Sequence, residues 1–265
     1  MKRKFFFSFL IIVALAIFLS GCSTVTGLFS KKQSPPSPEG SYNNGLLLLN
    51  KKKYEAAAKE FRIFKEQYPL SDLVPLVELR LADSLFFDKK YLEAFFQYEE
   101  FKKLHPIHPE IPYATYQMAM CHFKQLLTID RDQAQTHKSI ELFRVVAENY
   151  PQSPHAEQAR GKIAICQRQM ADHEFYIGNF YLKKKKYRAA LGRFEGILQK
   201  YPNSGLETKI QKLISKCRTE ILKEERNRQA LQDPADRKKR ADERERISRT
   251  AGIFRGLEKP IHISS

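Results

Sequence analysis

Hydrophobic residues recur at helical spacing along most of the chain, and one phrase of this pattern returns several times. The segment KKYEAAAKEFRIFKEQYP ends at Pro69, KKYLEAFFQYEEFKKLHP ends at Pro106, and KKYRAALGRFEGILQKYP ends at Pro202. Within each phrase apolar residues lie three and four positions apart, which is the spacing of one face of an α-helix. Because proline cannot continue a helix, each phrase predicts a helix that ends just before its proline.

A fourth copy ends at Pro151, and the four prolines bring further positions into alignment. A small residue lies twelve positions before each proline: Ala57, Ala94, Ser139 and Ala190. An aromatic residue lies eight positions before it: Phe61, Tyr98, Phe143 and Phe194. A residue with a ring lies directly before it: Tyr68, His105, Tyr150 and Tyr201. Small residues also lie 24 positions before three of the prolines, at Gly45, Ala82 and Gly178. This pattern resembles the tetratricopeptide repeat, a helix–turn–helix unit of about 34 residues.

The resemblance implies an all-α fold, a tetratricopeptide-like helical solenoid of about ten helices in five hairpins, over residues 41–227. The intervals between the prolines are 37, 45 and 51 residues. An insertion near Gln125–Gln133, inside the third hairpin, explains the second interval. The third interval predicts an extra helix, with a break near Ala171 and Asp172 that gives helices at 154–170 and 173–185. One unbroken helix over this span is the alternative.

The first residues are expected to be an export signal. MKRK is basic, and the apolar run Phe5–Leu19 is shorter than the roughly 20 residues of a membrane-spanning helix. The sequence LSGC, which ends at Cys22, resembles the bacterial lipobox. It implies removal of residues 1–21 and attachment of S-diacylglycerol and N-acyl groups to Cys22, with ordinary cleavage near Ser23 as the alternative. By resemblance to sorted lipoproteins, Ser23 favours the outer membrane.

The two segments that flank the repeats differ from them in composition. Residues 22–40 are rich in Ser, Pro and Lys without periodicity, which predicts a lipidated, flexible tether. Residues 228–265 are almost wholly charged at first and are expected to be disordered, because so few apolar residues cannot form a core. In this tail, Gly252–Leu257 is a candidate partner-binding tag.

Cysteine, charge and motif content narrow the function. Cys121, Cys166 and Cys217 each follow a repeat proline by 15 residues, so they are expected on successive helical layers as buried thiols rather than in disulfides. The net charge is +16, and lysines cluster in the turns before the second helices. These clusters are expected to form a basic edge that binds anionic lipid or an acidic partner. The alternative is that these lysines are simply solvated. Export argues against nucleic acid. No metal-ligand, nucleophile or phosphate-loop motif occurs, which predicts a protein that is not an enzyme and has no metal.

Two interaction surfaces are predicted. The repeat resemblance assigns to a concave groove a set of mainly aromatic and aliphatic residues suited to an extended peptide: Tyr42, Leu46, Leu49, Leu79, Asp83, Phe86, Phe87, Tyr113, Tyr116, Met120 and Phe123. For Leu46, Leu49, Phe86 and Phe123, a position in the core between layers is an equal alternative. The last repeat helix carries an apolar stripe without a later helix to bury it, and its outer half is predicted to dock a partner: Ile210, Leu213, Ile214, Ile221 and Leu222.

The lipobox, the tether, the repeats that end in YP and the run Ala171–Ser204 together resemble the BamD (ComL) family of lipoproteins. This second resemblance covers about residues 18–225. It implies a scaffold of the outer-membrane β-barrel assembly machinery, in which the first repeats bind unfolded outer-membrane proteins and the last repeats bind the periplasmic domains of the insertase BamA. The alternatives are another repeat-containing outer-membrane lipoprotein, such as a pilotin-like secretin assembly factor, and the helical domain of a periplasmic enzyme.

Overall fold

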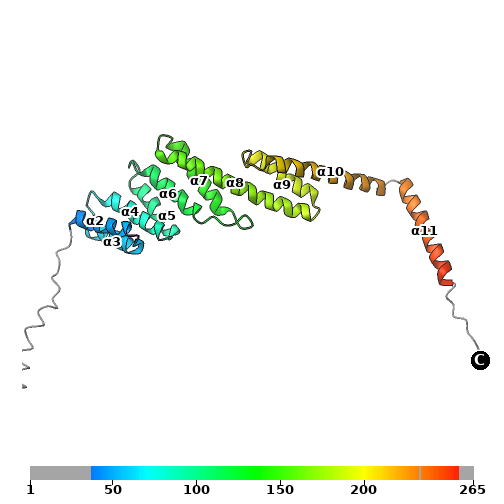
Figure 1. The fold of residues 1–265 in the computed structure, drawn as a ribbon, viewed down its shortest axis with the longest axis horizontal. Coiled ribbons are helices and arrows are strands. Elements are labelled where there is room, and N and C mark those ends of the chain that lie inside the picture. Colours follow the sequence, from blue (N-terminus) through cyan, green and yellow to red (C-terminus); the bar gives the residue numbers. More distant parts are fainter. Residues whose placement is uncertain (1–36, 233, 257–265) are drawn as a thin grey trace, which may run out of the picture. The chain divides into compact units, whose positions relative to one another are not determined.

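The computed structural model describes residues 37–232 and 234–256, and every regular element in these ranges is a helix (Figure 1). The prediction of an all-α, tetratricopeptide-like fold is confirmed. Cys22 and the remaining predictions for residues 1–36 lie outside the described residues. The ten helices are α2 (Pro38–Asn50), α3 (Tyr54–Gln67), α4 (Val74–Phe87), α5 (Tyr91–Leu104), α6 (Ile111–Phe123), α7 (Ala134–Asn149), α8 (Pro154–Lys183), α9 (Tyr187–Lys200), α10 (Glu207–Gln232) and α11 (Pro234–Gly256).

The chain divides into two compact units, residues 1–84 and 85–265. The described part of the first unit holds α2, α3 and most of α4, and α2 packs against α3. In the second unit each helix from α5 to α10 packs against the next one along the chain. Consecutive helices therefore form the layers that the repeat pattern predicts.

The aromatic residues of the repeat pack against its small residues, as expected. Phe61 and Phe194 are fully buried, and each ring lies against a glycine of the preceding helix. A Cβ atom at Gly45 would stand 2.4 Å from Cε1 of Phe61, and one at Gly178 would stand 2.6 Å from Cε1 of Phe194. Both distances are too short for any side chain, so glycine is required at these two positions for the helices to approach.

Three of the turns share one backbone conformation at a lysine. Lys52, Lys89 and Lys185 have φ angles of 58°, 63° and 56°, in the left-handed region that glycine usually occupies. After Lys185, the backbone N–H of Lys186 donates to Tyr181 at 2.9 Å, and that of Lys185 donates to Leu182 at 3.0 Å. This is the Schellman arrangement that ends a helix. The repeated turn sets the entry of each following helix.

The predicted break at Ala171 and Asp172 is wrong, since α8 is continuous over 30 residues. Ala171 is fully buried in the core formed with α9 and α10. Asp172 pairs with Arg168 one turn earlier at 3.0 Å. Neither glycine nor proline occurs near this position, so nothing interrupts the backbone hydrogen bonds.

The charged tail also departs from the prediction of disorder, because α10 continues to Gln232 and residues 234–256 form α11. Pro234 begins α11, where its fixed φ angle is compatible with a helix. Arg249 pairs with Glu245 one turn away at 2.6 Å. None of the α11 side chains that the structure describes is buried. The helix is therefore stabilised by local helix propensity and ion pairs and not by packing in a core.

The cysteines behave as predicted from their spacing. Cys121, Cys166 and Cys217 are free and buried on successive layers. Burial raises the pKa of the Cys121 thiol to about 12 and also raises the pKa of Cys166 and Cys217. These thiols therefore stay protonated and act as small core residues.

Candidate functional site

An aromatic surface lies where α6 meets the beginning of α8. The ring of His155 lies 5.4 Å from those of both Tyr113 and Tyr116, measured between centroids. Tyr113 is half-buried, whereas Tyr116 is only 8% exposed and also contacts Phe143. Tyr113 and the partly exposed Met120 are thus accessible, and their role in a peptide groove stays a prediction, whereas Tyr116 belongs to the core beneath them.

Two residues of this surface were not assigned to it from the sequence. His155 follows Pro154 at the start of α8, and its buried Nδ1 atom has no hydrogen-bond partner among the described residues. The ammonium group of Lys162 lies 4.6 Å from the centroid of the partly buried Phe123 ring, a cation–π contact. Only the packing of α8 against α6 brings His155 to Tyr113 and Lys162 to Phe123, so no local pattern in the sequence indicates these contacts.

The groove residues predicted for the first two hairpins divide between core and surface. Leu79 is fully buried and Asp83 is 2% exposed, so these two predictions of an open surface are wrong. Phe86 is 8% exposed, which agrees with its alternative position in the core. Asp83 pairs with Arg80 on the same helix at 2.5 Å, which satisfies a carboxylate that would be costly to bury alone. Tyr42, Leu46 and Leu49 are partly exposed, and Phe87 is 48% exposed.

The docking stripe predicted on α10 is mostly internal. Ile210, Ile214 and Ile221 are buried, and the first two pack with Phe194 and Ile197 of α9. Leu213 is partly buried, and Leu222, at 56%, is the exposed residue of the five. Of the predicted stripe, the helix therefore offers only Leu222 as an exposed apolar side chain.

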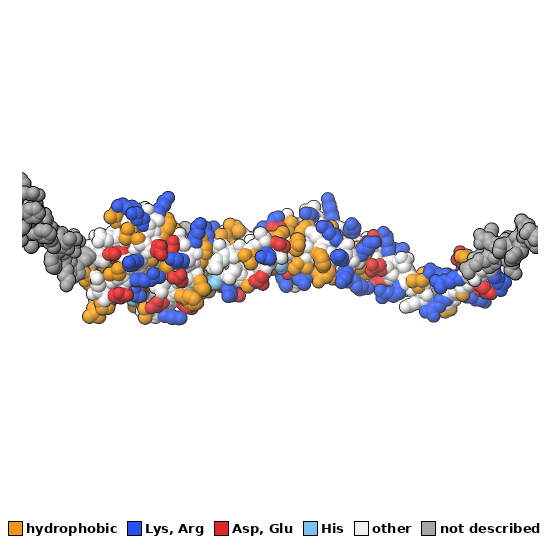
Figure 2. All heavy atoms as spheres, turned by 90° about the horizontal axis from the view of Figure 1, so that it is seen from below, with side chains coloured by type: hydrophobic (Ala, Val, Ile, Leu, Met, Phe, Trp, Pro, Cys, Tyr) orange, Lys and Arg blue, Asp and Glu red, His pale blue; other side chains and the backbone are white. Residues whose placement is uncertain are grey.

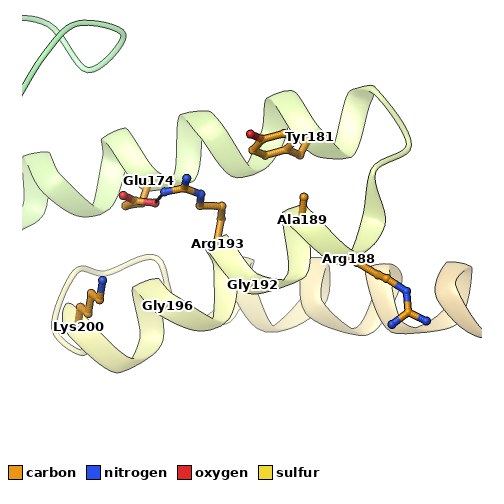
Figure 3. A pocket seen from close by; sticks show the side chains of 8 residues that line it. All are labelled: Glu174, Tyr181, Arg188, Ala189, Gly192, Arg193, Gly196 and Lys200. Atoms are coloured by element: carbon orange, nitrogen blue, oxygen red, sulfur yellow. Dashed lines mark hydrogen bonds and ion pairs between the residues drawn. The ribbon is translucent and has the colours of Figure 1, made fainter.

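A polar cleft of about 370 Å³ lies between α8 and α9 (Figure 3). Glu174 and Tyr181 come from α8, and Arg188, Arg193 and Lys200 come from α9. An ion pair of 2.8 Å joins Arg193 to Glu174 across the cleft, as the dashed line in Figure 3 marks. The cleft presents charged groups from both helices.

A second cleft, of about 470 Å³, lies between α9 and α10. Leu191, Ile221 and Leu222 form its apolar part. Arg218 pairs with Glu195 at 2.8 Å at its border, and Arg188 pairs with Glu225 nearby. Arg188 and Gly192 line both clefts, so the exposed face of α9 is the ridge between them.

Gly192 and Gly196 leave this ridge without side chains. They lie one turn apart on α9, and none of the described atoms lies within 4 Å of the point where a Cβ atom would stand on either of them. Unlike Gly178, neither glycine is required by a close neighbour among the residues that the structure describes. Each glycine weakens a helix by about 1 kcal/mol relative to alanine. Folding alone would therefore favour alanine at both positions of the ridge.

On the face drawn in Figure 2, Lys and Arg side chains are interspersed with Asp and Glu. Among the described residues, no group of three or more His, Cys, Asp or Glu is placed to hold a metal ion. Within the same ranges, none of the helices combines the length and the apolar character needed to cross a bilayer.

Comparison with known proteins assigns the chain to a family. Residues 36–231 match the YfiO family, described as outer membrane lipoprotein. The chain belongs to this family. A relative from Rickettsia prowazekii, named outer membrane protein assembly factor BamD, is 36% identical over 204 residues, which cover 76% of this chain and 78% of the relative. One of the same name from Caulobacter vibrioides is 32% identical over 160 residues, 60% of this chain and 52% of the relative.

The solved structures similar to this YfiO family member include TPR-like repeats of a kinesin light chain from Podosopora anserina. That structure has a TM-score of 0.41 and 12% identity, and the match covers 71% of this chain and 96% of the other.

Proposed function

We propose that the chain is a non-enzymatic lipoprotein scaffold for the assembly of outer-membrane β-barrel proteins. The YfiO family carries the description outer membrane lipoprotein, and the relatives are named outer membrane protein assembly factors. In this proposal the ridge of α9 binds the periplasmic domains of a BamA-like insertase, and the aromatic surface at α6 and α8 receives unfolded outer-membrane proteins. The chain takes part by binding and performs no chemistry.

The bare ridge at Gly192 and Gly196 is the observation that carries the insertase site. Glycines one turn apart on an exposed helix let a partner backbone come closer than side chains would allow. Arg188 and Arg193 flank the ridge, and arginine is the cation best suited to binding carboxylates at an interface. The partner face is therefore expected to be acidic, with an apolar side chain for the cleft beside Leu222.

The ridge is tested by the double substitution Gly192→Leu and Gly196→Leu in the full-length protein. Two leucines block close approach, so copurification with the insertase is expected to fall by at least about tenfold. They also improve helix propensity, so the variant is expected to unfold at a higher temperature than the parent. Lost binding together with raised stability points to an interface, because misfolding would lower both.

Gly161→Leu is the matched control, since Gly161 is an exposed glycine of α8 and no described atom lies within 4 Å of its Cβ position. It is expected to raise stability and leave copurification unchanged. If the double variant copurifies at full yield, the insertase binds elsewhere.

The anchor is part of the same proposal. Cys22 is proposed to carry S-diacylglycerol and N-acyl groups, which together give durable membrane attachment where one chain is marginal. Cys22→Ala is expected to leave the protein outside the outer-membrane fraction after fractionation of cells. Mature variant that is still tightly held in that fraction would contradict acylation at Cys22.

A further inference from the structure

A second exposed surface lies in the same unit, on the middle of α8. Three large apolar side chains of this helix are about half-exposed: Ile165 at 51%, Tyr176 at 50% and Phe180 at 53%. Their spacing of eleven and four residues places them on one face, because three turns of helix take about eleven residues. Gln169 and His173 occupy the turns between them on the same face.

The inserted loop between α6 and α7 is fastened to this face. The side-chain amide of Gln169 donates to the carbonyl of Leu127 at 2.8 Å. Nδ1 of His173 lies 2.6 Å from the carbonyl of Ile129 and must donate, since a carbonyl only accepts. Leu127 is 48% exposed and Ile129 is 39% exposed, so the loop adds two apolar side chains beside α8. We call these five residues the loop–helix patch: Leu127, Ile129, Ile165, Tyr176 and Phe180.

Lysines continue the patch at the end of α8. Lys183 lies eighteen residues after Ile165, which is five full turns, so it falls on the same face. Lys184, Lys185 and Lys186 follow in the turn, and all four lysines are exposed. The nearby acids are partly offset, because Asp172 pairs with Arg168 and because Arg131 lies between Asp130 and Asp132 in the loop.

We propose that the loop–helix patch and Lys183–Lys186 bind a lipid bilayer that contains anionic phospholipids. The five apolar side chains expose on the order of 400 Å², which is in the range of the largest apolar patch of a typical monomer, and such patches are often functional. Aromatic and aliphatic groups enter the headgroup region while lysines extend to lipid phosphates. Lysine is depleted at protein interfaces, which favours lipid over a protein partner. Membership of an outer membrane lipoprotein family places such a surface nearby. This inference goes beyond the proposed scaffold function and does not depend on the insertase or on a client.

Trypsin cleavage of the full-length lipoprotein, reconstituted into vesicles, tests the proposal. Each lysine near an anionic surface contributes about a fivefold preference for it. Two of the four lysines held at the surface would already favour it about 25-fold, so cleavage within Lys183–Lys186 is expected to be at least about tenfold slower on vesicles of phosphatidylglycerol and phosphatidylcholine than on phosphatidylcholine alone. The turn at Lys89 and Lys90 is the internal control, because Lys89 has the same left-handed backbone as Lys185.

The double substitution Tyr176→Ser and Phe180→Ser is expected to remove most of this protection, and Phe96→Ser, at a residue 53% exposed on α5, is expected to keep it. Three results would each overturn the proposal. These are equal cleavage of Lys183–Lys186 on both vesicles, equal protection of Lys89 and Lys90, and protection that appears only after an insertase or an unfolded client is added. The last result would assign the patch to a protein.

Discussion

Gly178 and Phe194 are in such close contact that a methyl group on the glycine would stand 2.6 Å from the ring. The ring belongs to a fully buried side chain in the core that α8, α9 and α10 share. Because surrounding residues hold the ring, it cannot retreat without moving the helices. This pair thus fixes the distance between α8 and α9, and with it the width of the cleft that Glu174 and Arg193 bridge.

The first prediction concerns that contact. Gly178→Ala is expected to lower the free energy of unfolding by about 1–3 kcal/mol, since overpacking displaces neighbours. Gly161→Ala, on the open face of the same helix, is expected to raise it by up to about 1 kcal/mol. Urea unfolding followed by circular dichroism measures both. Equal effects of the two substitutions would show that the ring yields freely.

The second prediction concerns the turn before α9. Lys185→Gly is expected to stabilise the protein by about 0.5–1 kcal/mol, because glycine adopts the left-handed conformation without the steric cost that a side chain incurs. Lys184→Gly is the control, since Lys184 has a φ angle of −81° and gains nothing from glycine. The midpoint of thermal unfolding distinguishes them. A lower midpoint for Lys185→Gly would mean that the lysine side chain itself stabilises the turn.

The third prediction concerns the aromatic surface. Tyr113→Ala combined with Met120→Ala is expected to weaken binding of an extended, aromatic-rich peptide by about 2 kcal/mol, roughly thirtyfold in Kd. Phe96→Ala, at an exposed residue of α5, is expected to leave Kd unchanged. Fluorescence anisotropy of a labelled peptide measures the change. An unaltered Kd in a folded double variant would remove this surface from the peptide site.

The fourth prediction concerns pH. Burial raises the pKa of Cys121 from 9.0 to about 12 in the folded protein. The unfolded state therefore loses this proton first, and stability falls as pH rises between these two values, by up to about 1.4 kcal/mol per pH unit. Cys121→Ala is expected to flatten the decline over that range, although it costs stability at neutral pH. Parallel declines in the two proteins would show that other groups cause it.

The sequence predicted those features that depend on residues close together in the chain. Gly45 and Gly178 were recognised because they keep a fixed distance from a repeat proline, and the contacts with Phe61 and Phe194 bear this out. Gly192 has the same chemistry but no such distance, so its exposure on the ridge appears only when α9 is packed.

Burial was predicted less well for the groove and for α10. A position within a repeat says which way a side chain points, but not how deeply neighbouring layers cover it. Leu79 and Tyr116 were therefore assigned to a surface although they are buried. The interval of 51 residues correctly indicated added helix before α9, yet a count of residues does not distinguish a second helix from a longer first one.

The unbroken α8 connects the aromatic surface and the polar cleft within its unit. His155 lies in its first turn beside Tyr113, and Glu174 lies nineteen residues later at the cleft, roughly 28 Å along the axis. A helix this length resists bending, so a peptide that tilts its beginning swings its far end by a proportionate distance. Two shorter helices joined by a loop would absorb that tilt in the loop. Because both surfaces share this rod, we expect occupation of the surface at Tyr113 to change the position of Glu174 at the cleft.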